Sequence, residues 1–150
     1  GYLEVFDLDE AGKIKGSQEI FRFEGGSVNP QRQKSSHPHC FKFDVKGEYG
    51  FMPDLGRDTV DVFQVKDGAL VKRDDLSYKA KPGAGPRHFT FHPDGQRAYL
   101  INELDFTITA FQYEAGELKA THTVPTKPAD FGILLGITGT CQAIVGFHTE

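Results

Sequence analysis

The most regular pattern in the chain is a short run of apolar, strand-forming residues followed by a polar turn. Residues 2–8 read Tyr-Leu-Glu-Val-Phe-Asp-Leu, and similar runs occupy 60–65 and 108–113. Each run ends in a turn that contains glycine, after which another strand-like segment begins. These features predict pairs of β-strands joined by tight turns. No stretch of 11 or more residues before residue 125 shows helical apolar periodicity, so the predicted fold class is all-β.

The pattern also repeats over a longer distance, because two copies of one unit lie 48 residues apart without a gap. One copy opens at 38–43 with Pro-His-Cys-Phe-Lys-Phe and the other at 86–91 with Pro-Arg-His-Phe-Thr-Phe. The register continues through matched pairs such as Gly47/Gly95, Thr59/Thr107, Phe63/Phe111 and Gly68/Gly116. A repeat of this length made of short strands is typical of one β-propeller blade, a four-stranded antiparallel sheet.

The repeat divides the chain into blades and connections. The first full unit predicts strands at 40–44, 49–53, 59–65 and 69–76, so the chain begins inside one blade and continues through two more. Polar, turn-rich segments at 25–36 and 82–86 predict the connections between blades. A third copy should open with proline 48 residues after Pro86, but Leu134 stands there. We therefore expect propeller blades over residues 1–124 and an atypical tail over 125–150.

Composition restricts the partners that the chain can have. With 150 residues, 38% hydrophobic and 25% charged, the chain is expected to be ordered and globular. Its net charge of -4 and scattered basic residues argue against a nucleic-acid partner. No apolar run approaches the roughly 18 residues of a membrane span. The two cysteines, Cys40 and Cys141, are too few for a disulfide framework and favour a reduced, cytoplasmic location.

The first candidate site residues are His37 and His39, which flank Pro38. Two histidines at this spacing could hold a metal, but no nearby carboxylate or thiolate completes a ligand set, so no metal site is predicted. A histidine that caps a turn is the alternative. The repeat favours a functional role, because the residue equivalent to His39 is Arg87. An arginine there could bind a carboxylate, a phosphate or a developing oxyanion, although an ion pair between blades is also possible.

Carboxylate and amide side chains end the second predicted strand of each full blade. Asn102 and Glu103 follow an apolar run, and Asp54 is the equivalent of Asn102 in the preceding unit. Because a buried carboxylate is unfavourable unless it is paired or hydrated, Glu103 could pair with Arg87, act as a general acid or lie at the rim. Asp54 could contact a ligand or serve as a strand-end turn residue. Cys40 fits a core position better than a nucleophile.

At these residues the chain resembles the lactonase family of seven-bladed propellers. That family includes propeller-type 6-phosphogluconolactonases and 3-carboxy-cis,cis-muconate lactonising enzymes. The similar segments occur in order within residues 1–124, at 37–39, 53–58, 83–88, 91–95 and 99–104.

The resemblance implies a ring of about seven blades, of which this chain would supply about three. The remaining blades would then be missing, and a chain that starts at Gly1 and has Met52 as its only methionine is expected to be a piece of a longer one. By the family pattern the catalytic residues are His39, Arg87 and Glu103. The implied substrate contacts are His37, Asp54, His88 and Asn102. No cofactor is implied, and a further arginine would lie beyond residue 150.

The implied function is hydrolysis of a sugar-acid lactone, foremost 6-phosphogluconolactone to 6-phosphogluconate. The partner is then a small anionic lactone, held by Arg87 at its anionic group or carbonyl oxygen. His39, with an ordinary pKa of roughly 6.5, would activate water as general base. The alternatives are cyclisation of 3-carboxy-cis,cis-muconate and a non-catalytic propeller fragment. The absence of tryptophan argues against a protein-docking propeller of the Trp-Asp type.

Overall fold

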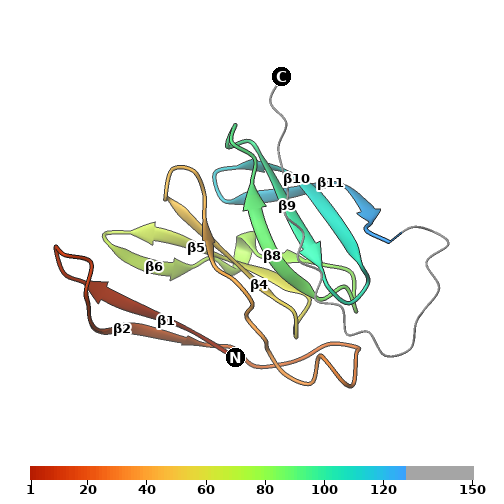
Figure 1. Cartoon of the computed structure of the whole chain (residues 1–150), viewed down its shortest axis with the longest axis horizontal. Coiled ribbons are helices and arrows are strands. Elements are labelled where there is room, and N and C mark those ends of the chain that lie inside the picture. Colours follow the sequence, from red (N-terminus) through yellow and green to blue (C-terminus); the bar gives the residue numbers. More distant parts are fainter. Residues whose placement is uncertain (128–150) are drawn as a thin grey trace.

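The computed structural model describes residues 1–127 as three antiparallel sheets (Figure 1). The first sheet is a hairpin of β1 (Tyr2–Leu8) and β2 (Ile14–Arg22). The middle sheet contains β3 (Lys42–Phe43), β4 (Tyr49–Asp54), β5 (Thr59–Lys66), β6 (Ala69–Lys72) and β7 (Tyr78–Lys79). The last sheet has the order β11-β10-β9-β8 and contains β8 (Pro86–Phe91), β9 (Arg97–Asn102), β10 (Thr107–Glu114) and β11 (Glu117–Pro125).

The two complete sheets repeat the same strand register at the predicted interval, which confirms the propeller-blade fold class. In the middle sheet Lys42 is paired with Phe51, and in the last sheet Thr90 is paired with Tyr99, each residue 48 positions later. The pairing continues identically through the third and fourth strands as far as the turns that join them. The hairpin β1–β2 corresponds to the outer two strands of a preceding blade, as predicted.

Two predicted strands differ from those in the structure. The first strand of the middle sheet is shorter than 40–44 and spans only Lys42–Phe43. The fourth, predicted over 69–76, ends at Lys72. A short 3-10 helix, Asp74–Leu76, follows it, and β7 then returns to pair with β5. In the last sheet β11 runs on to Pro125 without this excursion, one residue past the predicted blade boundary. Most of the predicted tail, with Cys141, lies outside the described residues.

The turns between the third and fourth strands explain why the repeat keeps glycine at this place. Asp67 and Gly68 both have positive φ, at 51° and 80°, and join β5 to β6 in a two-residue loop. Ala115 and Gly116, at 46° and 90°, do the same between β10 and β11. Two successive positive φ angles define the turn whose twist matches an antiparallel hairpin, and glycine adopts them without a steric penalty.

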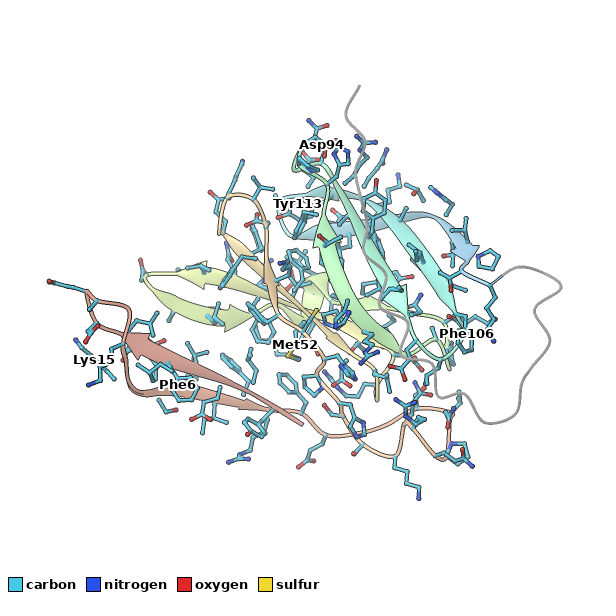
Figure 2. The ribbon with its side chains drawn as sticks, in the orientation of Figure 1. Phe6, Lys15, Met52, Asp94, Phe106 and Tyr113 are labelled. Atoms are coloured by element: carbon cyan, nitrogen blue, oxygen red, sulfur yellow. The ribbon has the colours of Figure 1, made fainter. Side chains whose placement is uncertain are left out.

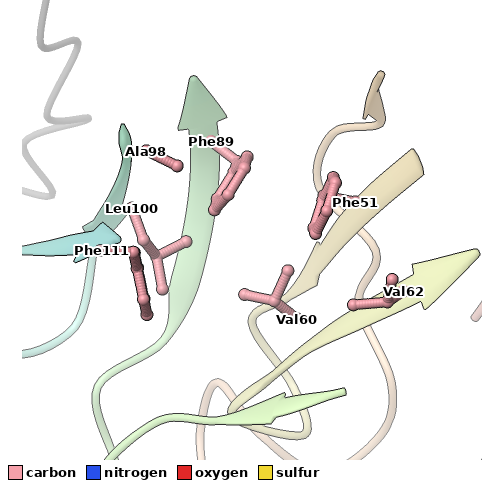
Figure 3. Packing of buried hydrophobic residues seen from close by; sticks show 7 residues of the cluster. All are labelled: Phe51, Val60, Val62, Phe89, Ala98, Leu100 and Phe111. Atoms are coloured by element: carbon pink, nitrogen blue, oxygen red, sulfur yellow. The ribbon is translucent and has the colours of Figure 1, made fainter. Parts of the chain in front are cut away.

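The main core lies between the middle and last sheets (Figure 3). Phe51 stacks on Phe89 with ring centroids 5.2 Å apart and an interplanar angle of 13°, and both side chains are buried. The remaining buried members of this cluster are Val60, Val62, Ala98, Leu100 and Phe111. Burial of so much aromatic and branched apolar surface is the main favourable term that holds the two blades together.

A second cluster joins the middle sheet to the hairpin. Met52 and Phe63 follow Phe51 and Val62 in sequence and therefore point to the opposite face, where they pack with Phe23. The middle sheet is thus covered on both faces. The hairpin is more exposed, and Phe6 near its outer end is 45% exposed (Figure 2). In residues 1–127 no helix is long and apolar enough to cross a membrane.

Candidate active site

The predicted site residues gather at one end of the two complete blades, the end that Phe106 marks in Figure 2. The backbone there repeats at the same interval as the strands. Pro38 forms an isolated bridge with Asp54, and Pro86 is paired with Asn102. These equivalent pairings hold the two residues that follow the prolines, His39 and Arg87, at the same level of adjacent blades.

Arg87 and Glu103 form the centre of the cluster. The Nε atom of Arg87 lies 3.2 Å from Oε2 of Glu103, and their side chains are only 16% and 11% exposed. The backbone N–H of Glu103 donates to the carbonyl of Gly85 at 2.8 Å, which fixes this residue beside the strand that carries Arg87. The structure thus contains the pairing with Arg87, which is one of the roles that the sequence left open for Glu103.

A β-bulge directs Arg87 into this cluster. In the ladder between β8 and β9, Pro86 is paired with Asn102 and His88 with Ile101, so Arg87 is the extra residue. A bulge turns its side chain away from the regular alternation, and such irregularities are frequent next to active sites. The buried Nη1 atom of Arg87 makes no hydrogen bond within residues 1–127. A buried donor without an acceptor is unfavourable by roughly 1–3 kcal/mol, so an acceptor oxygen there would be bound favourably.

His39 and His88 lie next to each other at the surface of the cluster. Their ring centroids are 6.4 Å apart and the rings are perpendicular. Partial burial, and then the positive charge of Arg87, lower the pKa of His39 below its ordinary value of 6.5, whereas Glu103 acts in the opposite direction. A lowered pKa keeps the imidazole of His39 neutral near pH 7 and able to accept a proton.

Arg32 completes the cluster, and nothing in the sequence pattern predicts it. Its Nη2 atom lies 2.6 Å from Oε1 of Glu103, so Glu103 is paired with an arginine at each oxygen. Arg32 belongs to the connection between β2 and β3, 71 residues from Glu103. The contact depends on the folded path of this connection, for which an irregular polar segment gives no sequence signal.

Asp54 and Asn102 are the last residues of β4 and β9, and His37 lies in the connection just before Pro38. Asp54 is fully buried, and its oxygens accept bonds from Ser36, from the backbone N–H groups of His37, Gly56 and Arg57, and from the Arg57 side chain. Hydrogen bonds from Ser36 and Arg57 lower the pKa of Asp54 against the effect of burial. These contacts fit the strand-end role that the sequence left open for Asp54, and its contact with a substrate stays a prediction.

Asn102 is also buried, and its amide donates to the hydroxyls of Thr107 and Thr109 at 2.9 and 3.3 Å. His37 has an exposed side chain next to Gly56, and its backbone carbonyl accepts a hydrogen bond from the N–H of Leu55 at 3.0 Å. Cys40 packs against the main core, and burial raises the pKa of its thiol, which disfavours a nucleophilic role.

Asp58 positions the loop that leads into Arg87. Its two carboxylate oxygens accept the backbone N–H groups of Gly83 and Gly85, each at 2.7 Å. The side chain is 4% exposed and the backbone φ is 56°. Gly85 has a φ of 68°, and a Cβ added there would lie 2.5 Å from Leu104. The loop therefore needs glycine at this position and a carboxylate beneath it, so Asp58 acts on the site through Arg87.

The two described cavities lie away from this cluster. One, of about 820 Å³, is lined by Gln96, Arg97, Gln112, Tyr113 and neighbouring residues, and another of about 450 Å³ includes Asp44 and Asp94. Asp94 and Phe106 mark opposite ends of the last sheet in Figure 2, so these hollows belong to the far end of the blades. No group of three or more His, Cys, Asp or Glu side chains in residues 1–127 could hold a metal ion.

The chain is similar to lactonases along most of its length. The family described as lactonase, 7-bladed beta-propeller, matches residues 1–134, which extends past the predicted boundary at 124. A 6-phosphogluconolactonase of Formosa agariphila is 39% identical over 122 residues, covering 78% of this chain and 34% of that protein. A 6-phosphogluconolactonase of Bacillus subtilis is 33% identical over 133 residues, covering 87% of this chain and 37% of that protein.

The fold is similar to a solved structure as well. A periplasmic gluconolactonase of Pseudomonas aeruginosa superposes with a TM-score of 0.81 at 31% identity, covering 88% of this chain and 38% of that one. The chain therefore spans about a third of the length of the relatives that it matches.

Proposed function

The chain belongs to the lactonase family of seven-bladed β-propellers, and from this membership we propose that it carries a lactone-hydrolysing site built on His39, Arg87 and Glu103. The proposal extends to 6-phosphogluconolactone as substrate, because two similar proteins are 6-phosphogluconolactonases. The observation that carries it is the Arg87–Glu103 pair at 3.2 Å, whose charges both act on the adjacent His39.

The chemistry requires a base, an oxyanion partner and an orienting group. Neutral His39 takes a proton from water as the water oxygen attacks the lactone carbonyl carbon. Arg87 donates to the carbonyl oxygen, which becomes negatively charged in the tetrahedral intermediate. The ring C–O bond then breaks, and protonated His39 returns its proton to the leaving alkoxide. Glu103 holds the Arg87 guanidinium in place and balances its charge.

The names of the relatives favour lactone opening over cyclisation of 3-carboxy-cis,cis-muconate. The arrangement is also compatible with a ligand-binding fragment that lacks activity, because the chain covers about a third of its relatives. Since one similar structure is a periplasmic protein, the cytoplasmic location stays a prediction.

The test is the rate of 6-phosphogluconolactone opening by the purified chain, above spontaneous hydrolysis. We expect His39→Ala to lose about 10²–10⁴-fold, the usual contribution of a general base. His122→Ala, at an exposed position on β11, is the matched control and should retain the rate. In the wild-type chain the rate should fall on acidification with a midpoint below 6.5, because the pKa of His39 is lowered. A folded chain without any rate above the spontaneous one would refute hydrolysis by this chain.

A further inference from the structure

Arg32 lies on a rigid part of an otherwise irregular connection. The side-chain oxygen of Asn29 accepts the backbone N–H groups of Gln31 and Arg32, each at 3.0 Å, and thereby forms a tight local turn. Gln33 is 1% exposed, and its amide donates to the carbonyl of Leu55 at 2.8 Å while its oxygen accepts from Asn29. The turn is therefore anchored to Leu55, the residue that follows β4 of the middle sheet.

The two arginines that pair with Glu103 have different environments. Arg32 is 46% exposed, whereas Arg87 is 16% exposed and comes from a strand bulge. One carboxylate between two guanidinium groups leaves the trio with one net positive charge. Because Arg32 has five N–H donors and one is used by Glu103, its exposed guanidinium can bind a second anion.

The geometry assigns separate tasks to these two arginines. Arg87 is the more buried one, and its charge lowers the pKa of His39 more than the charge of Arg32 does, so it suits the reacting carbonyl. Arg32 contacts the other oxygen of Glu103 and is exposed to solvent at the outer side of the cluster. We propose that Arg32 recognises the phosphate of a phosphorylated sugar lactone and thereby makes the site selective for it over the unphosphorylated lactone. This inference rests on the proposed function.

The physical reason is that guanidinium and phosphate groups form short, frequently bidentate hydrogen bonds. A sugar lactone without phosphate offers only hydroxyls at this place. Loss of one charge-assisted contact weakens binding about ten- to a hundredfold. Removal of Arg32 should therefore weaken binding of the phosphorylated acid and leave the unphosphorylated acid almost unchanged.

The test measures binding of the two stable hydrolysis products, 6-phosphogluconate and gluconate, to the full chain. Calorimetry gives the affinities, and the NMR signals of His39 and His88 report binding at this site. For Arg32→Gln we expect a ten- to hundredfold loss for 6-phosphogluconate and less than a twofold change for gluconate. Arg32→Lys, which keeps the charge but not the fork of donors, should fall between. Arg97 pairs with Asp94, which lies at the far end of the last sheet, so Arg97→Gln removes the same charge away from the site and is the matched control.

The outcomes separate the inference from the function on which it rests. If the wild-type chain binds both acids, but Arg32→Gln weakens both equally or neither, the selectivity assignment is wrong and the lactonase proposal stands. If neither acid moves the signals of His39 and His88 in the wild-type chain, the proposed function fails and the role of Arg32 fails with it. A melting temperature equal to that of the wild-type chain shows that each variant is folded.

Discussion

Asp58 offers the sharpest test of how one blade positions the site of the next. Its buried carboxylate holds the N–H groups of Gly83 and Gly85 at 2.7 Å each. Asp58→Asn keeps the shape of the side chain, and asparagine tolerates a positive φ. The substitution replaces one acceptor oxygen with an NH₂ group. One charge-assisted bond, worth about 1.5–3 kcal/mol, is lost, and a backbone N–H then faces a donor. We expect a loss of about 2–4 kcal/mol in the free energy of unfolding.

Urea unfolding gives the stability change, and amide hydrogen exchange locates it. The amides of Gly83 and Gly85 should exchange faster in Asp58→Asn even under native conditions. The matched control is Asp67→Asn, since Asp67 has nearly the same φ of 51° but lies exposed in the β5–β6 turn. That change should stay within about 0.5 kcal/mol, as is usual for surface substitutions. Equal effects of the two substitutions would refute the assignment of Asp58 as the support of the loop.

Two further predictions concern other parts of the described chain. The hydroxyl of Tyr113 donates to Asp44 at 2.7 Å between the two complete blades. Tyr113→Phe should therefore lower the free energy of unfolding, measured in urea, by about 1.5–3 kcal/mol. The control Tyr2→Phe, at an exposed position, should leave it unchanged. The backbone N–H of Gln96 and then the Arg97 side chain lower the pKa of Asp94 from 3.8 to about 2. Because this pKa is depressed by folding, its stabilising effect is present above pH 3.8 and is lost as the pH falls through about 2. A carboxyl midpoint near 3.8 by NMR titration of the folded chain would contradict this.

The repeat in the sequence predicts most of the fold because it acts on every strand pair at once. One interval of 48 residues sets the strand register, the hairpin turns and the equivalence of His39 with Arg87. The features that it does not predict are local departures. The 3-10 helix at Asp74–Leu76 has no counterpart in the last sheet, and the contact of Arg32 with Glu103 comes from a connection outside the repeated strands. Such irregularities depend on packing around single residues, which periodicity does not encode.

The site itself depends on the same distinction between repeated and unrepeated features. Leu55 and Glu103 are equivalent positions, and each donates its backbone N–H to the equivalent carbonyl of the preceding connection, at 3.0 and 2.8 Å. Leu55 is 2% exposed and packs as an apolar residue, whereas Glu103 at the same backbone position is paired with two arginines. The repeated backbone thus supplies the position, and one substitution within the repeat supplies the charge. A propeller can therefore change its chemistry at single blade positions while the shared strand register preserves its fold.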